Sequence, residues 1–525
     1  MTIAAIGRLR LQNPVLWKDL RTRMRGTRAF LVQGLYVGIL ALSMGVAYLL
    51  EWRTFTAAGS PAAAFASQLG LRIYQVIFWI QAAMVVVVTP TLTASAITIE
   101  HEQRTYELLV CTRLTPRTIL VGKLLSGWLF VVMLLTCSLP MSALCLMLGG
   151  VSGGEIFWNY VVLCLFALLF ASVGILFSSI YRRSVQSVPL AYVCTFLFAS
   201  ATSGIGPLQG GPFWTLNMFA WGAAGGSAIG FFSFSIPAWL PVVIVLPLAC
   251  LLMLNLGIQR VPHFAADRAL AIRLLTAGLV VAFMLLAMGG AGAGALGYAA
   301  AIALGWASLL IVMPAAFATG YRPQSWPRSL VGWMIAGLDP RRIFSSELSG
   351  GWAYALVLVA LYSATLLLAP SVPGGQPAPD VWAIFVFLAA IVFCYSALGA
   401  LGAAFDSRAL GVAPILLLYT FNWLVTGFIW TTYRGAVTQP GVAEQYALQL
   451  SPFVGLMTLF GHGSSQTQSL LPGPWGGRPF WEVSAMLHLI VGLVALATAE
   501  MVYQVYRRRA LLREAPVEHR AESGE

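Results

Sequence analysis

The chain alternates long apolar stretches with short polar ones, and the apolar stretches determine the predicted fold class. Runs of roughly 20 apolar residues are long enough to cross the hydrocarbon core of a bilayer as helices. Such runs occur at residues 29–50, 73–99, 122–149, 156–180, 185–203, 234–257, 272–290, 294–318, 352–371, 381–403, 411–431 and 483–506. The pattern therefore predicts an all-α polytopic membrane protein with about 12 transmembrane helices.

Composition and charge support this class and orient the chain. Hydrophobic residues make up 59% of the sequence and charged residues 9%, whereas soluble domains carry about 25% charged residues. All the Lys and Arg residues except Arg53, Arg72, Arg434 and Arg478 fall on one side of the predicted spans. The positive-inside rule then places the N- and C-termini in the cytoplasm, as expected of a multi-pass protein of the cytoplasmic (inner) membrane. Because the basic residues are spread over every inner loop, they do not indicate a nucleic-acid surface.

Residues 1–28 are predicted to contain a cytoplasmic helix that lies on the membrane surface. Asn13 followed by Pro14 is a typical helix start, with a capping side chain and a proline in the first turn. Apolar residues then recur at helical spacing from Leu16 to Met24, while basic residues follow another stripe. This amphipathic pattern indicates an interface helix. The residues assigned to it are Asn13, Pro14, Lys18, Asp19, Arg21 and Arg25.

The densest run of mixed charge, residues 100–121, lies between the second and third predicted spans. Continued as a helix from the second span, Glu100 and Arg104 would be four residues apart and could pair on one face. Thr115-Pro116 should then end the helix, because proline disfavours helical geometry in the residue before it. Leu108 and Leu109 are apolar residues among charges, which indicates a docking surface rather than a solvated loop.

This segment resembles one found in the permease subunits of type-2 ABC exporters. In that family Glu-x-Glu-x-x-Thr-x-Glu-Leu-Leu follows the second span and Gly-Lys opens the third, as do Glu100–Leu109 and Gly122-Lys123 here. The opening Asn13-Pro14-Val15 also fits. The turn departs from the pattern, because Thr112-Arg113-Leu114 stands where the family has Thr-Pro-Leu, and the proline comes later, at Pro116. The resemblance is specific over residues 13–123.

The resemblance implies that residues 100–121 couple this chain to a separate ABC ATP-binding subunit. Dimerisation of that subunit on ATP would move the spans between inward and outward states. The chain would then be a transport subunit and not an enzyme, with no cofactor or metal of its own and with ATP and Mg on the partner. No Gly-x-x-x-x-Gly-Lys-Ser/Thr phosphate loop occurs in the sequence. The coupling residues are Glu100, Glu102, Arg104, Thr105, Glu107, Leu108, Leu109, Pro116, Arg117 and Lys123.

The sequence also indicates an internal duplication at an offset of 224 residues. Leu114-Thr115-Pro116-Arg117-Thr118-Ile119 aligns with Leu338-Asp339-Pro340-Arg341-Arg342-Ile343, and four of the six residues are identical. Two parallel six-helix repeats are therefore predicted. The first half covers residues 29–260. The second, degenerate half covers residues 261–506, with a cytoplasmic loop at 319–351 and an outer loop at 432–482, before a cytoplasmic tail at 507–525.

The duplication predicts a second coupling segment. Its residues would be Leu338, Asp339, Pro340, Arg341, Arg342 and Glu347. If the second half is not a functional repeat, the permease should instead form a homodimer.

Three functions remain open at this stage. The leading hypothesis is the membrane subunit of an ATP-driven exporter that works by alternating access, in contact with membrane lipid and with no nucleic-acid partner. The first alternative is an ion-coupled secondary transporter, although charged residues that could mark an ion pathway are almost absent from the spans. The second is a membrane-embedded transferase, for which the outer loop offers only Glu444, His462 and Glu482 as acid–base groups.

Overall fold

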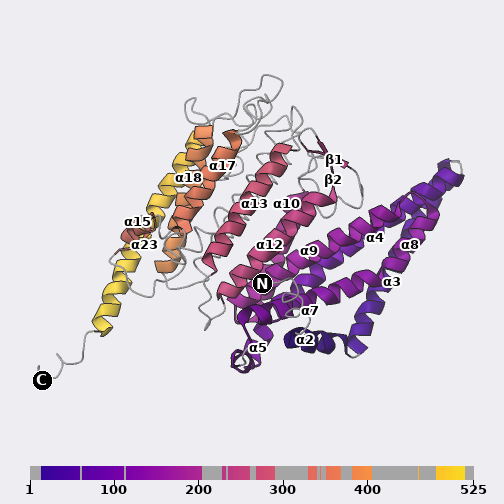
Figure 1. Cartoon of the computed structure of the whole chain (residues 1–525), viewed down its shortest axis with the longest axis horizontal. Helices are drawn as coiled ribbons and strands as arrows, with labels where there is room; N and C mark the ends of the chain where they lie inside the picture. Colours follow the sequence, from indigo (N-terminus) through magenta and orange to yellow (C-terminus); the bar gives the residue numbers. More distant parts are fainter. Residues whose placement is uncertain are drawn as a thin grey trace, which may run out of the picture. The chain divides into compact units, whose positions relative to one another are not determined.

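The structure, a computed structural model, describes helices in both halves of the chain. The described residues are 13–25, 27–58, 62–111, 114–203, 228–231, 234–260, 268–289, 329–339, 343, 351–367, 381–404, 459 and 480–514. They form two compact units, Met1–Leu275 and Thr276–Glu525. Figure 1 colours the chain from indigo at the N-terminus to yellow at the C-terminus.

The first unit is a helical assembly with one short hairpin. Its elements are α2 (Pro14–Met24), α3 (Thr27–Ala58), α4 (Ala62–Ala94), α5 (Thr98–Glu102), α6 (Tyr106–Val110), α7 (Pro116–Cys137), α8 (Leu139–Leu148), α9 (Gly153–Ile180), α10 (Ser184–Ser203), β1 (Ala228–Phe231), β2 (Phe234–Pro237) and α12 (Trp239–Arg260). Helix α13 (Ala269–Gly289) straddles the division between the units. Strands β1 and β2 pair antiparallel.

Seven described helices are long and apolar enough to cross a membrane. They are Ala29–Arg53, Ser67–Glu102, Pro116–Leu148, Gly153–Ile180, Trp239–Gln259, Val381–Leu401 and Trp481–Arg508, and shorter apolar helices cover Leu270–Leu286 and Gly351–Ala364. The predicted multi-pass, mainly helical fold is thus confirmed. The predicted spans 294–318 and 411–431 lie outside the described residues, so the predicted total of about 12 remains an expectation.

The sixth predicted span begins later than the sequence pattern indicated. Residues 234–237 were expected in the span but form strand β2, and the helix starts at Trp239. The difference arises because the backbone N–H and C=O groups of an apolar stretch such as that around Phe234 can be hydrogen-bonded in either a helix or a hairpin. Pairing with β1 in the register Phe231↔Phe234 forms the hairpin, and Pro237 lies at its end.

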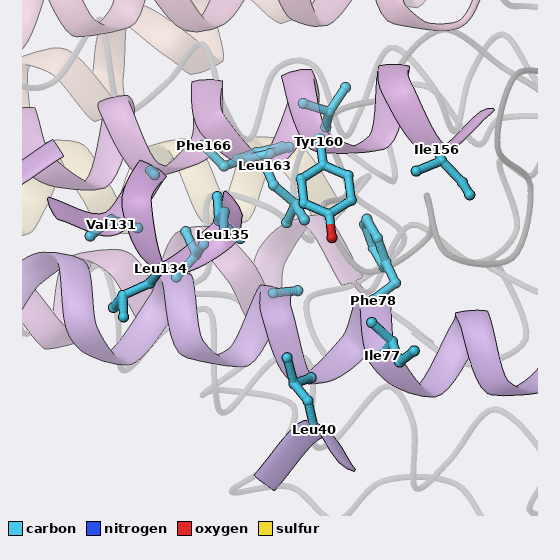
Figure 2. Packing of buried hydrophobic residues seen from close by; sticks show 14 of the residues in the cluster. Leu40, Ile77, Phe78, Val131, Leu134, Leu135, Ile156, Tyr160, Leu163 and Phe166 are labelled. Atoms are coloured by element: carbon cyan, nitrogen blue, oxygen red, sulfur yellow. The ribbon is translucent and has the colours of Figure 1, made fainter. Parts of the chain in front are cut away.

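Helix α9 forms the centre of the first unit. It packs against α4, α7, α10 and α12, and its residues Tyr160, Leu163 and Phe166 are buried in the main core cluster. Figure 2 shows Leu163 and Phe166 on the side of Leu134 and Leu135 from the neighbouring helix α7, while the Tyr160 ring points toward Phe78. Within a bilayer, such interdigitation is a principal source of helix association, because lipid tails are as apolar as the side chains.

A buried polar cluster joins α4, α8, α9 and the junction between α7 and α8. Gln81 Nε2 donates to Ser138 Oγ at 2.8 Å and to the Tyr160 hydroxyl at 2.9 Å. The Tyr160 hydroxyl also lies 2.9 Å from Ser142 Oγ. Ser138 stands at the junction of α7 and α8, so the cluster fixes the relative direction of these two helices where their backbone is interrupted.

Two glycines allow α4 to approach its neighbours closely at Thr93. A Cβ added to Gly127 of α7 would lie 2.6 Å from Thr93 Cγ2. A Cβ added to Gly174 of α9 would overlap Thr93 Oγ1, and would lie 2.9 Å from the backbone nitrogen of Ala94. The C-terminal end of α4 is therefore wedged between α7 and α9, immediately before the segment that carries the candidate site.

The second unit is built on a pair of long helices. Its described elements are α15 (Leu330–Ala336), α17 (Gly351–Leu367), α18 (Val381–Ala404) and α23 (Phe480–Glu514). Helices α18 and α23 lie side by side (Figure 1), and a Cβ on Gly492 would meet Phe393 Cδ1 at 2.9 Å. Of the outer loop predicted at 432–482, only residue 459 and residues 480–482 belong to the described part.

The Thr93 contact predicts a packing defect in Gly174→Ala. The added methyl group should force α4 and α9 apart and lower the free energy of unfolding by about 1–3 kcal/mol, the range for overpacked cores. Thermal unfolding in mild detergent measures this. Gly38→Ala on α3 is the matched control, because nothing lies within 4 Å of its added Cβ, and it should be neutral or slightly stabilising. Equal unfolding temperatures for the two variants would contradict the close approach.

Candidate functional site

The candidate site begins where the second span is interrupted. The sequence predicted a helix running on from the second span, but α4 ends at Ala94 and a turn at residues 95–97 separates it from α5. Ser178 of α9 accepts hydrogen bonds from the backbone nitrogens of Ile97 (2.8 Å) and Thr98 (3.3 Å). Ser187 of α10 donates to the Ala94 carbonyl at 2.7 Å. Side chains from two other helices thus satisfy the backbone groups that the interruption frees.

Lys123 is the central residue of the site. Its side chain is only 4% exposed, and Nζ lies 2.7 Å from Glu100 Oε1 and 3.6 Å from Asp19 Oδ2. Nζ also donates to the Ala96 carbonyl at 2.9 Å. One ammonium group therefore connects α2, the α4–α5 turn, α5 and α7. The other oxygen, Glu100 Oε2, is buried without a hydrogen-bond partner among the described residues.

These contacts correct the expected pairing of Glu100 with Arg104. Helix α5 ends at Glu102, so residues 100 and 104 do not share a helical face. Lys123, 23 residues further on, takes the Glu100 carboxylate instead. The sequence identified all three residues as site residues but assigned the wrong partner.

The interface helix α2 is seated on the start of α7. Asn13 Oδ1 accepts from the Val15 nitrogen at 3.1 Å, which confirms the predicted cap, and Asn13 Nδ2 donates to the Thr118 carbonyl at 2.7 Å. A Cβ on Gly122 would lie 2.8 Å from Asn13 Nδ2 and 3.1 Å from Val15 Cβ. Asn13-Pro14 and Gly122-Lys123, which are far apart in sequence, therefore form one contact.

The exposed face of α2 is basic. Lys18, Arg21 and Arg25 are exposed, as Trp17 also is. Arg23 is half-buried and donates from Nη2 to the Leu92 carbonyl at 3.0 Å. Arg23 was not predicted as a site residue, because nothing in the local sequence pattern distinguishes it from the other arginines of the helix.

A tight turn separates α5 from α6. The Thr105 nitrogen donates to the Glu100 carbonyl at 2.9 Å, and the Arg104 nitrogen donates to the His101 carbonyl at 3.2 Å. These two bonds define a Schellman motif. Arg104 has φ of 58°, so a non-glycine residue occupies the left-handed position that usually holds glycine.

Helix α6 is the part of the segment that projects. Glu107 is exposed, and the Leu108 side chain is 71% exposed. Tyr106 anchors the helix by stacking on His101, with ring centroids 3.8 Å apart. Burial raises the pKa of Tyr106, and the Glu100 carboxylate raises it further, so the phenol stays neutral. For Leu109, the side chain lies outside the described part.

Two further contacts fix the segment to the membrane helices. Glu102 Oε1 accepts from the Ser184 nitrogen at the start of α10 at 2.7 Å. Thr115 caps α7, where its Oγ1 accepts from the Thr118 nitrogen at 3.3 Å. Pro116 is buried at the first position of α7 and Arg117 is exposed. Thr115-Pro116 therefore begins the third span, while the preceding helix α6 already ends at Val110.

The second coupling segment predicted by the duplication is described only in part. Leu338 is exposed, and Asp339 follows α15 in the chain. Pro340, Arg341, Arg342 and Glu347 lie outside the described residues.

A comparison with known protein families identifies the region that carries the site. Residues 13–213 match the family described as ABC-2 family transporter protein. The match begins at the cap residue Asn13 and includes α2, the segment 100–121 and Lys123. No curated protein matches the chain. The resemblance to ABC-2 permeases drawn from the sequence motifs is thereby confirmed.

The buried ammonium predicts a large effect for Lys123→Met. The substitution leaves the Glu100 carboxylate buried without its partner, which costs about 3–5 kcal/mol when one member of a buried ion pair is removed. Thermal unfolding in detergent should show this loss, and Glu100→Gln in the Lys123→Met background should recover part of it. Arg117→Met, an exposed site on the same helix, is the control and should change little. A Lys123→Met variant as stable as this control would disprove the structural role of Lys123.

The backbone of Arg104 predicts opposite effects for glycine at two adjacent positions. Arg104→Gly relieves a left-handed residue and should stabilise the turn by about 1 kcal/mol. Gln103→Gly, where φ is −84°, should destabilise it by about 0.5–1 kcal/mol through the added chain entropy of glycine. Amide hydrogen exchange at Thr105, which donates to Glu100, reports on the turn in both variants. Faster exchange in Arg104→Gly than in the wild type would be inconsistent with this geometry.

Proposed function

We propose, on the premise that residues 13–213 form an ABC-2 family transporter domain, that this chain is the membrane subunit of an ATP-driven exporter in the cytoplasmic membrane. A separate ABC ATP-binding subunit would bind ATP and Mg and supply the energy. This chain would provide the path for the substrate. The segment 100–121 would be its contact with the ATP-binding subunit.

The observation that carries this proposal is the projection of α6 from a rigid support. Leu108 is 71% exposed beside Glu107, on a five-residue helix. An exposed apolar side chain on a short, anchored helix can fill a pocket of a protein partner, because burial of its apolar surface is favourable. Glu107 beside it would add charge selectivity at the rim of the same contact.

The support of α6 provides a route from this contact to the membrane helices. Helix α5 is fixed to α7 and α2 through Lys123, and to α10 through the Glu102–Ser184 hydrogen bond. A displacement of the segment would therefore be transmitted to all three helices together. ATP can drive a change between two states of the permease only if the ATP-binding subunit binds those states with different affinity. This segment is placed to sense that difference.

Purification of the chain from its native membranes in mild detergent tests the proposal. An ABC ATP-binding subunit should co-purify in stoichiometric amount, and the ATPase activity of the complex should depend on this chain. If no such subunit binds, and transport instead collapses when an ion gradient is removed, the chain is an ion-coupled carrier and the proposal is wrong.

The exposed tip of α6 predicts that Glu107→Arg and Leu108→Arg weaken the contact without unfolding the permease. Association with the co-purifying ATP-binding subunit should fall about tenfold or more in each variant, which corresponds to about 1.4 kcal/mol or more. Titration of the purified permease with the purified ATP-binding subunit measures the affinity between the two proteins. Glu102→Ala is a poorer test, because it also removes the hydrogen bond to the start of α10.

Arg508→Glu is the matched control for these variants. Arg508 is an exposed charged residue near the end of α23, and reversing its charge should leave the affinity unchanged. If Glu107→Arg and Leu108→Arg bind the ATP-binding subunit as tightly as the wild type does, the contact with that subunit lies elsewhere.

A further inference from the structure

The third span is interrupted at Ser138, the residue at the junction of α7 and α8. Pro140 has no backbone N–H, so it cannot donate to the carbonyl four residues earlier, at Thr136, as a helical residue would. The Ser138 nitrogen donates to the Leu135 carbonyl at 3.1 Å, which tightens the last turn of α7. The two helices are therefore held to each other less firmly at this junction than the backbone is held within either helix.

The two ends of the interrupted span are both fixed by other elements. Lys123 ties the start of α7 to α2 and α5. Beyond the end of α8, a Cβ added to Gly70 of α4 would overlap the Gly149 carbonyl oxygen. A Cβ added to Gly150 would overlap the Ser67 carbonyl oxygen, also on α4. A span that is fixed at both ends and interrupted between them moves most easily at the interruption.

The Ser138 hydroxyl has used all of its hydrogen-bonding capacity. A hydroxyl carries one proton and two lone pairs, and Ser138 Oγ donates its proton to the Leu135 carbonyl at 2.6 Å. One lone pair accepts from Gln81 Nε2 at 2.8 Å. The Tyr160 hydroxyl lies 2.8 Å away, and because the Ser138 proton is already in use, Tyr160 is the donor. Both lone pairs of Ser138 Oγ are thus occupied.

A third donor lies next to this saturated oxygen. Tyr36 of α3 is only 6% exposed, and its hydroxyl lies beside Ser138. The Tyr36 hydroxyl has no hydrogen-bond partner among the described residues. Leaving a buried polar group unpaired is costly, and no water is present within hydrocarbon to replace the missing bond. Three donors therefore compete for two lone pairs, and Tyr36 is the donor left unpaired.

Both donors that now occupy Ser138 have other partners. Gln81 Nε2 also donates to the Tyr160 hydroxyl at 2.9 Å, so either residue keeps this bond if it leaves Ser138. The Tyr160 hydroxyl lies 2.9 Å from Ser142 Oγ as well. Replacing one of these donors by Tyr36 would break one hydrogen bond to Ser138 and form another. Two arrangements of the cluster are therefore close in free energy.

We propose that Ser138 is a two-position switch in the third span. In the first position, which the structure describes, its hydroxyl accepts from Gln81 and Tyr160. In the second position it accepts from Tyr36 in place of one of these donors, and the junction of α7 and α8 bends toward α3. Such a switch supplies the two discrete arrangements that a coupled membrane protein needs.

The same span connects the switch to the candidate site. Helix α7 carries Lys123 near its start and leads to Ser138 directly after its end. A displacement of the candidate site would therefore change the strain at the junction and favour one position of the switch. This connection rests on the proposed function, whereas the exchange of donors at Ser138 does not.

Fluorine NMR of the purified full-length chain in nanodiscs tests the switch without any partner subunit. A 3-fluorotyrosine placed only at Tyr36 reports whether the neighbouring hydroxyl is hydrogen-bonded. The wild type should contain both forms, with the unbonded form in excess. Gln81→Met removes one competing donor and should raise the ratio of bonded to unbonded form about two- to tenfold, which is the change that one hydrogen bond commonly supplies.

Three further variants separate donor exchange from a general loosening of the cluster. Tyr160→Phe removes the other competing donor and should raise the ratio as Gln81→Met does. Ser138→Ala removes the acceptor and should abolish the bonded form. Ser142→Ala is the matched control, because Ser142 bonds Tyr160 but not Ser138, and it should leave the ratio unchanged. A wild-type ratio in both Gln81→Met and Tyr160→Phe would overturn the switch.

Pro140→Ala tests whether the exchange requires bending at the junction. The substitution returns the missing backbone N–H, so it should stiffen the span and lower the ratio of bonded to unbonded form at least twofold. An unchanged ratio would show that the exchange occurs without bending and would overturn that part of the proposal.

The connection to the candidate site has a separate measurement. Adding the co-purifying ATP-binding subunit with ATP should shift the ratio in the wild type. A ratio that stays constant although the subunit binds would overturn the connection and leave both the switch and the proposed function intact. Failure of the switch in the isolated chain would likewise leave the proposed function intact.

Discussion

The candidate site depends on one buried charge. Removing an ammonium group from water costs several kcal/mol unless paired groups surround it, and Lys123 is almost fully buried. Its partners Glu100, Asp19 and the Ala96 carbonyl come from different elements. None of these elements can move away alone without exposing or isolating a charge. The interface helix, the projecting segment and the third span therefore behave as one mechanical body within the first unit.

The sequence predicted those features that depend on neighbouring residues. The cap at Asn13 and the non-helical residue Thr115 before Pro116 are local features, and both are present, whereas the role of Thr115 as the cap of α7 was not predicted. The partner of Glu100 could not be predicted in this way, because the competition between Arg104 and Lys123 was decided by where α5 ends. The position of α5 is fixed by the interruption of the helix at residues 95–97, where Ser178 of α9 accepts a hydrogen bond from the Ile97 nitrogen. Such contacts across 80 residues leave no periodic signal in the sequence.

The membrane-spanning pattern was predicted well and the boundaries less so. A long apolar run has few alternatives to a buried helix, whereas an apolar stretch beside Gly and Pro can also form a hairpin, as residues 228–237 do. The predicted duplication divides in the same way. The motif at Leu338 was readable from the sequence, but α15 and its hydrogen bonds to Glu500 were not, because α23 lies 170 residues away in the chain.

The hydrogen bond from the Ser184 nitrogen to Glu102 has a consequence for how docking could be observed. The first amides of a helix have no acceptor within the helix itself, and here the acceptor is carried by the projecting segment. The protection of the Ser184 amide from hydrogen exchange therefore depends on Glu102, which lies outside α10. Any event that rotates Glu102 away would fray α10 at its first turn, so the exchange rate of a single backbone proton would report the position of the whole segment.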